Sequence, residues 1–176
     1  MMEGREEVTN GGTINSALND KHVIVCETDN SEVTIESGAS PYILTFNVPT
    51  WVQGSAASES TNANPKITYT TYTCNVKGGG LSGNARLIKQ GDGILTLPKA
   101  DFSHKGETNI WAGTLNFYGT MKQSPLWLNR FAVLNSNGGE FMSIKADYAS
   151  VIRPGGADTK GELTTDSLTL GFGSIS

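Results

Sequence analysis

Single glycine residues separate many of the short apolar runs in this chain, and this spacing constrains the fold more than any other feature. Gly113 alone divides the run TNIWA from TLNFY, and Gly91-Asp92-Gly93 divides LIKQ from ILTL. A one-residue corner cannot reverse a strand into a hairpin, but it can bend the chain by part of a turn. The pattern therefore favours a coil of stacked parallel strands that turns at its glycines.

The runs between these corners are rich in Val, Ile, Thr, Tyr and Phe, the residues that fit a pleated sheet. Apolar spacing typical of a helix is almost absent, and only residues 13–20 could hold a turn or two. We therefore expect an all-β fold. The expected strands cover residues 22–27, 32–36, 42–48, 66–76, 85–90, 94–97, 108–112, 114–118, 126–135, 140–146, 149–153, 161–164 and 167–170.

Two all-β architectures are compatible with these strands. The first is a right-handed parallel β-helix, a solenoid of seven or eight turns if each uses roughly 20 to 25 residues. The second is a β-sandwich, in which Asp92-Gly93 and Asn137-Gly138 would form hairpin turns. The two differ in one pairing: a sandwich needs 87–90 to pair with 94–97, whereas a β-helix stacks each segment on other turns.

The length of 176 residues predicts one β-helical domain over residues 1–176. Residues 49–65 have neither a helical nor an alternating period and are expected to form a loop excursion. The C-terminal residues LTLGFGSIS continue the strand rhythm without a polar cap. Because uncapped solenoid ends expose strand edges, we expect either a fragment of a longer surface protein or end-to-end self-association.

Charge and composition limit the partners. The formal net charge is −4 and no basic block interrupts the chain, so a nucleic-acid partner is not expected. No run approaches the roughly 18 apolar residues of a transmembrane segment, and the N-terminus has no signal-peptide pattern. Cys26 and Cys74 fit no zinc motif. They are either buried small side chains or a disulfide between neighbouring strands.

The segment from Leu87 to Leu115 resembles the autotransporter-associated β-strand repeat of bacterial surface proteins. The resemblance extends to a second segment, Val151 to Leu170, and covers about half of the chain. It implies a right-handed parallel β-helix that is secreted or displayed on a Gram-negative cell, with a leader that was either removed or left out of the chain. The matching residues are Leu87, Lys89, Gly91, Gly93, Leu95, Thr96, Leu97, Asp101, Phe102, Gly106, Thr108, Ile110, Gly113, Thr114 and Leu115.

Several motifs resemble known ligand sites without their full context. Residues 78–83 satisfy G-x-G-x-x-G, but no helix follows to meet a dinucleotide. Gly-Asp pairs lack the nine-residue period of calcium-binding repeats, so neither a metal nor a cofactor is expected. Asp101, His104 and Lys105 are interpreted as solvated corner residues. Glu140, Lys145, Asp147 and Arg153 form the best charged cluster that a polysaccharide-acting enzyme could use, although ion pairing explains them equally well.

The function that these observations favour is structural and adhesive, without catalysis. Trp111, Trp127 and Tyr118 are the candidate exposed aromatic residues, which could bind a glycan or a protein on a host or bacterial surface. The alternatives are a polysaccharide-acting lyase or glycoside hydrolase module and a carbohydrate-binding module. The candidate structural corners are Gly91, Gly93, Gly113, Gly155 and Gly156.

Overall fold

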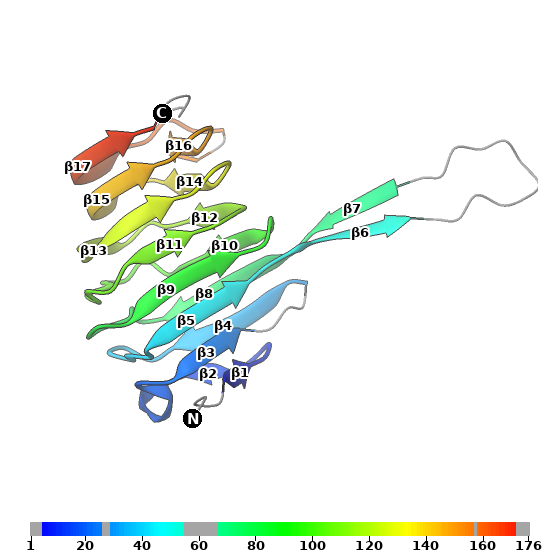
Figure 1. Cartoon of the computed structure of the whole chain (residues 1–176), viewed down its shortest axis with the longest axis vertical. Helices are drawn as coiled ribbons and strands as arrows, with labels where there is room; N and C mark the ends of the chain where they lie inside the picture. Colours follow the sequence, from blue (N-terminus) through cyan, green and yellow to red (C-terminus); the bar gives the residue numbers. More distant parts are fainter. Residues whose placement is uncertain (1–4, 26–28, 55–66, 157, 172–176) are drawn as a thin grey trace, which may run out of the picture.

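The computed structural model describes residues 5–25, 29–54, 67–156 and 158–171. Two parallel sheets face each other along the whole molecule (Figure 1). The eight-stranded sheet contains, in spatial order, β1 (Glu6–Val8), β3 (His22–Val25), β5 (Ile43–Asn47), β9 (Arg86–Gln90), β11 (Thr108–Ile110), β13 (Thr120–Leu128), β15 (Gly139–Ala146) and β17 (Leu163–Leu170). The seven-stranded sheet contains β2 (Thr13–Ile14), β4 (Ser31–Ile35), β8 (Thr73–Gly78), β10 (Ile94–Thr96), β12 (Thr114–Asn116), β14 (Val133–Ser136) and β16 (Val151–Pro154).

The chain alternates between the two sheets, so each turn contributes one strand to each of them. We call one such turn a rung, and the described residues form about seven rungs. The expected parallel β-solenoid is thereby confirmed, and the β-sandwich alternative is wrong. In particular, β9 and β10 do not form a hairpin, because β9 pairs with β5 and β11 whereas β10 pairs with β8 and β12. Asp92-Gly93 and Asn137-Gly138 lie at corners between the sheets.

Apolar side chains from successive rungs fill the interior. Leu87 and Leu95, on facing sheets, are both completely buried. Phe102, Phe117 and Phe141 form an aromatic stack inside three successive rungs, with ring centroids 5.4 Å apart at each step. Alternation along each strand sends every second side chain inward, and parallel register places like side chains above one another. The core is therefore a continuous column.

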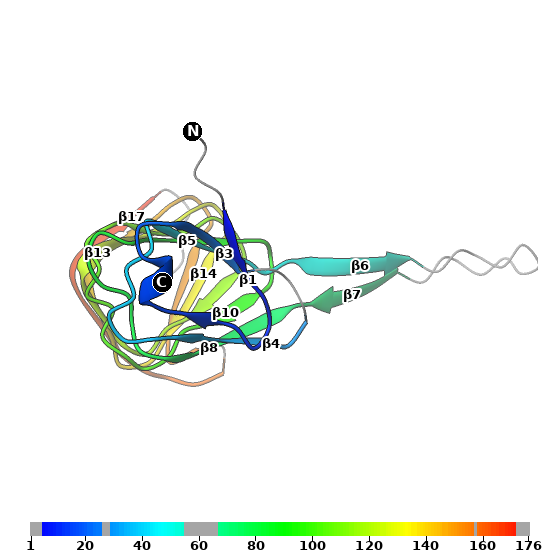
Figure 2. The same ribbon diagram turned by 90° about the horizontal axis from the view of Figure 1, so that it is seen from below.

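One rung is interrupted by a hairpin that projects from the solenoid (Figures 1 and 2). Strands β6 (Thr50–Gly54) and β7 (Ile67–Thr71) pair antiparallel between β5 and β8. We call this hairpin the arm. The segment 49–65, expected to be a loop, thus begins with a strand, while residues 55–66 lie outside the described residues. The single strand expected over 66–76 is divided into β7 and β8.

Two other expectations change in detail. The run 126–135 is not one strand, because β13 ends at Leu128 and the chain turns a corner before β14 begins at Val133. The region 13–20 begins with β2 and then holds one short 3-10 helix, η1 (Ser16–Leu18), and the Asn15 side chain accepts a hydrogen bond from the Ala17 N–H at its start. Cys74 is buried as a free thiol, whereas Cys26 lies outside the described residues.

Candidate functional site

The corner that follows β9 is built around Lys89. This side chain points into the solenoid and is completely buried. Its ammonium group donates hydrogen bonds to the carbonyl oxygens of Gly91 at 2.6 Å and Ala112 at 2.9 Å, with a longer contact to that of Gln90 at 3.3 Å. Since Ala112 belongs to the next rung, Lys89 joins two successive corners. A lysine therefore occupies an interior position of the solenoid, where apolar side chains are usual.

Glycines make room for this arrangement. Gly91 and Gly113 have φ angles of +74° and +70°, values that favour glycine. A Cβ atom on Gly113 would lie 2.4 Å from the Gly93 carbonyl oxygen and 2.6 Å from Lys89 Nζ. A Cβ atom on Gly93 would lie 2.6 Å from the Tyr72 carbonyl oxygen. The Gly91-Asp92-Gly93 segment therefore brings the backbones of neighbouring rungs into close contact.

The Lys89 ammonium also has an altered acidity. Burial lowers the pKa of Lys89 to about 8, and the negative charge of Asp92 opposes that change. Because the ammonium is enclosed by backbone carbonyls, it serves the corner and does not face a solvent-filled site.

The glycines of the later corner differ from one another. Gly155 and Gly156 have φ angles of +91° and +97°. A Cβ atom on Gly155 would lie 2.3 Å from the Thr159 carbonyl oxygen, whereas one on Gly156 would meet nothing within 4 Å. Gly155 is thus constrained by both conformation and space, and Gly156 by conformation alone.

Exposed aromatic residues lie on three successive corners on the same side of the solenoid. Trp111 follows β11, Phe131 follows β13 and Tyr148 follows β15, and their side chains are 50%, 61% and 45% exposed. We call these three residues the aromatic ridge. The Phe131 and Tyr148 rings pack edge to face at 6.4 Å. The Arg130 guanidinium lies 4.9 Å from the Phe131 ring and 5.1 Å from the Tyr148 ring, so a cation packs against the ridge, and the Asp147 carboxylate lies beside Tyr148.

Of the three aromatic residues singled out from the sequence, the structure brings two to this region. Trp127 lies on the outer face of β13, exposed, with Lys145 Nζ 4.4 Å from its ring centre. Trp111 is on the ridge itself. Tyr118 is only partly exposed and lies on the opposite corner, between β12 and β13. Phe131, Arg130 and Tyr148 were missed, because no strand alternation marks an outward side chain at a corner.

The four residues of the charged cluster considered for an enzyme have different contacts in the structure. Glu140 forms an ion pair with Lys122 on the neighbouring strand. Lys145 contacts Trp127, the Asp147 side chain accepts a hydrogen bond from the Tyr148 N–H at 2.7 Å, and Arg153 belongs to the other sheet. These contacts are those of ion pairing and packing on the surface of the solenoid.

His104 is part of a buried polar network, and the expectation that it is a solvated corner residue is wrong. The described side chains of His104, Thr108 and Ser124 are all completely buried. Ser124 Oγ donates to the Gly106 carbonyl oxygen at 2.6 Å, so it accepts from Thr108 Oγ1 at 2.9 Å. Thr108 in turn accepts from His104 Nε2, also at 2.9 Å. Lys105 is exposed, and the exposed Asp101 carboxylate accepts from Thr120 Oγ1 at 2.8 Å.

This hydrogen-bond direction fixes the state of the imidazole. His104 Nε2 carries the proton, and Nδ1 has no partner among the described residues. A second proton would create a buried donor without an acceptor, and burial lowers the pKa of His104 to about 4. The Ser124 hydroxyl is inaccessible and donates to the backbone, which is not the arrangement of an activated nucleophile.

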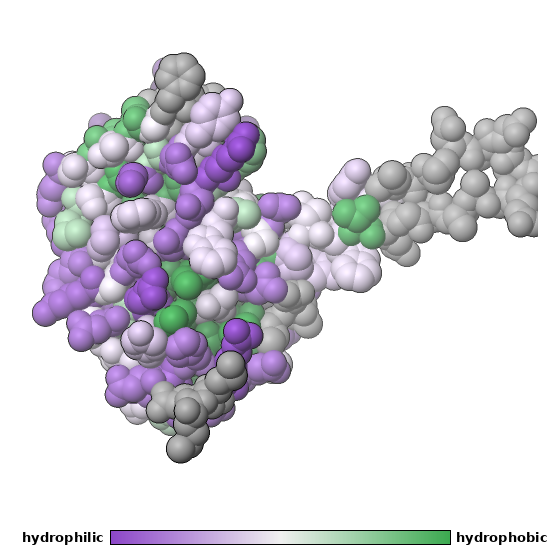
Figure 3. Space-filling model, in the orientation of Figure 1, coloured by the Kyte–Doolittle hydropathy of each residue, from purple (hydrophilic) through white to green (hydrophobic). Residues whose placement is uncertain are grey.

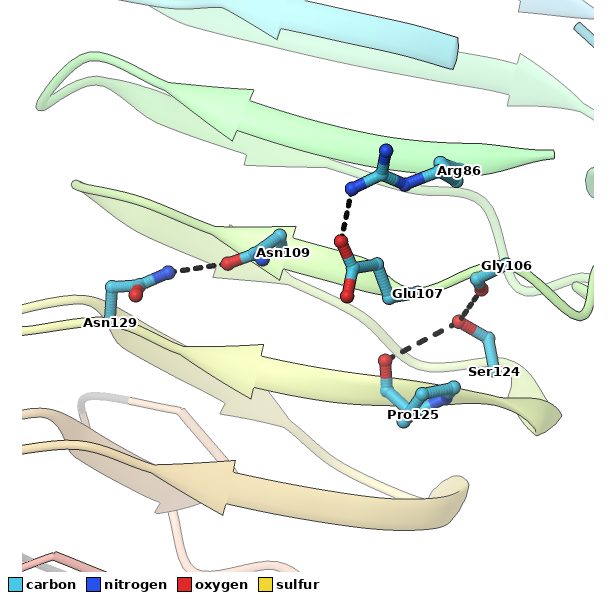
Figure 4. A network of polar contacts seen from close by, with 7 residues as sticks. All are labelled: Arg86, Gly106, Glu107, Asn109, Ser124, Pro125 and Asn129. Atoms are coloured by element: carbon cyan, nitrogen blue, oxygen red, sulfur yellow. Dashed lines mark hydrogen bonds and ion pairs between the residues drawn. The ribbon is translucent and has the colours of Figure 1, made fainter. Parts of the chain in front are cut away.

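The outer face of the eight-stranded sheet carries polar contacts between rungs (Figure 4). Arg86 pairs with Glu107, and the Asn129 side chain donates to that of Asn109. Figure 3 shows this face as mainly polar, with apolar residues near its centre and at its upper left. A hollow of about 260 Å³ is lined by Arg5, His22, Val23, Ile24, Ile43, Thr45, Ile88 and Gln90. This lining offers no carboxylate.

Within the described ranges, no three His, Cys, Asp or Glu side chains gather as a metal site would require. The described part of the chain also contains no helix with the length and apolarity needed to cross a membrane.

Comparison with known proteins gave no relative. No protein family, no curated protein and no solved structure matched this chain.

Proposed function

We propose that this chain is a structural and adhesive segment of a secreted or surface-displayed bacterial passenger protein of the autotransporter type, without catalysis. The proposal is supported by the resemblance of residues 87–115 and 151–170 to the passenger repeat, together with a parallel solenoid over the described chain. Such a solenoid is a stiff spacer, because each rung is hydrogen-bonded to the next.

The observation that carries the adhesive part is the aromatic ridge. Trp111, Phe131 and Tyr148 expose large flat side chains on neighbouring rungs, next to the Arg130 guanidinium. Aromatic faces stack on the apolar faces of sugar rings, and a guanidinium binds carboxylates. The ridge therefore suits a surface glycan that contains acidic sugars. Trp127 and Lys145 extend the same chemistry onto the sheet.

An array of neutral and acidic surface glycans, probed with the 176-residue chain, tests this function. We expect binding to acidic glycans, and binding that weakens in the Trp111→Ala and Trp127→Ala variants, whose unchanged circular dichroism would show intact folding. If the unmodified chain bound no glycan, or if both variants bound as tightly as the unmodified chain, the adhesive role of these residues would be contradicted. Binding to a surface protein alone would replace the glycan by a protein ligand.

A further inference from the structure

The hollow on the outer face of the eight-stranded sheet has an apolar floor. Three partly exposed isoleucines form this floor, Ile24 on β3, Ile43 on β5 and Ile88 on β9, and we call them the isoleucine floor. The strand register places Ile24 and Ile88 on either side of Thr45 in one row across the sheet, and Ile43 in the neighbouring row. Figure 3 shows apolar surface in the part of this face that β5 and β9 occupy in Figure 1.

The isoleucine floor differs from the outward positions further along the same sheet. There Arg86 pairs with Glu107, and the Asn129 side chain donates to that of Asn109. Asn109 lies in the same row as Ile88, one strand further on. The later strands thus satisfy their outward side chains by pairing polar groups with one another. An apolar patch surrounded by polar residues on such a face indicates a contact surface for a ligand.

Three polar side chains lie around the isoleucine floor, those of Arg5, His22 and Gln90. Among the described residues, the side chains of Arg5 and Gln90 make no hydrogen bond or ion pair. The His22 ring stacks on that of Tyr42 with centroids 5.2 Å apart. Each of the three side chains can donate a hydrogen bond. An apolar surface with a few converging polar groups is the usual composition of a small-ligand site.

Charge and size select the kind of ligand. The exposed Arg5 guanidinium supplies a positive charge, and no carboxylate lines the hollow. Glu7 is the register partner of Ile24 on β1, but it is exposed and lies outside the lining. A guanidinium binds a carboxylate through two parallel hydrogen bonds. The volume of about 260 Å³ is smaller than that of sites for drug-sized ligands, so the ligand is a small organic acid.

We propose that this hollow binds a small carboxylic acid, with the carboxylate on Arg5 and an apolar body on the isoleucine floor. The side chains of His22 and Gln90 donate hydrogen bonds that orient the acid. Strands β3, β5 and β9 are each paired at both edges, so a strand added at either end of the sheet leaves the hollow open. The inference is independent of the glycan proposal, because no lining residue belongs to the aromatic ridge.

Nuclear magnetic resonance of isotope-labelled isoleucine methyl groups, with phenylacetate as the probe, tests the site. We expect saturable shifts at the isoleucine floor and none at Ile94, which is partly exposed on the other sheet. Phenylacetamide lacks the charge and acetate lacks the apolar body, so each should bind at least about tenfold more weakly. Absence of saturable shifts, equal shifts at Ile94, or equal affinity for phenylacetamide would overturn the proposal.

Two single variants test the role of the guanidinium. Arg5→Gln should weaken phenylacetate binding by at least about tenfold and leave phenylacetamide binding unchanged. Lys21→Gln is the matched control, because Lys21 is a nearby exposed cation that pairs with Glu6 and does not line the hollow. Unchanged resonances of buried isoleucine methyl groups show that each variant is folded. Equal loss of affinity in the two variants, or unchanged affinity in Arg5→Gln, would contradict a carboxylate site at Arg5.

Discussion

The buried ammonium group of Lys89 donates a 2.9 Å hydrogen bond to the carbonyl oxygen of Ala112, which lies one rung further along the solenoid. In the register of the eight-stranded sheet Lys89 occupies an interior position, between Phe46 and Ile110. A charged side chain at an apolar position is tolerated because its protons reach the carbonyls of two tight corners. The corners and the lysine therefore form one structural unit.

Replacing Lys89 by Met should lower the free energy of unfolding by about 2 kcal/mol, because the Gly91 and Ala112 carbonyl oxygens lose their buried donor. This loss exceeds the gain from no longer burying a charge. Urea unfolding at neutral pH measures the effect. Lys77→Met is the control, since the Lys77 side chain is 65% exposed in a surface ion pair with Glu32 and should change stability by less than about 1 kcal/mol. Equal effects of the two variants would contradict a special role for Lys89.

Alanine at Gly113 should destabilise the chain by about 3 kcal/mol, because it adds both an unfavourable φ angle and a contact with the Gly93 carbonyl. Gly138 separates the two causes. It has a similar φ of +74° but open space around it, so Gly138→Ala should cost only about 1 kcal/mol. Thermal unfolding of both variants provides the comparison. If Gly113→Ala were as stable as Gly138→Ala, close packing of the rungs would not be the reason for the glycine.

Acidification should destabilise the fold through His104. The folded-state pKa is lowered to about 4 from a usual value of 6.5, so the unfolded chain binds more protons between these two pH values. Stability is therefore lost as the pH falls from about 6.5 to about 4, by up to about 3 kcal/mol, and no further below that window. Urea unfolding of the unmodified chain and of His104→Gln measures this loss as their difference.

The glutamine variant keeps an N–H donor for Thr108 but does not titrate. His22→Gln is the control, because His22 is only partly buried and stacks on Tyr42. If the free energy of unfolding fell equally with pH in the unmodified chain and in His104→Gln, the buried imidazole would not be the cause of the loss of stability in acid.

The rungs could be predicted from the sequence because alternation and single glycines are local signals. Leu87, Leu95 and Gly113 each report their environment through their own residue type. The alternation Leu87-x-Lys89 also predicts that Lys89 points inward, but a charged side chain is ordinarily expected at the surface. The burial of His104 could not be predicted, because its partners Thr108 and Ser124 come together only when successive rungs stack.

The arm and the ridge could not be predicted for a related reason. Strands β6 and β7 are five residues each, and β7 continues into β8 without a glycine, so the return of the chain into the solenoid has no local sequence signal. Phe131 sits at a corner with a φ of +65°, where alternation gives no direction. The alignment of Phe131 and Tyr148 with Trp111 follows only from the way that successive rungs stack.

The central claim is that the aromatic ridge is the adhesive surface, and the arm provides its most direct test, because Trp51 and Tyr69 are exposed aromatic residues outside the ridge. Titration calorimetry with the glycan that binds best measures the Kd of two double variants. The ridge variant carries Phe131→Ala and Tyr148→Ala, and the arm variant carries Trp51→Ala and Tyr69→Ala. We predict at least about tenfold weaker binding for the ridge variant, since each lost stacking contact is worth about 1 kcal/mol, and an unchanged Kd for the arm variant. Weaker binding by the arm variant with full affinity in the ridge variant would contradict the account.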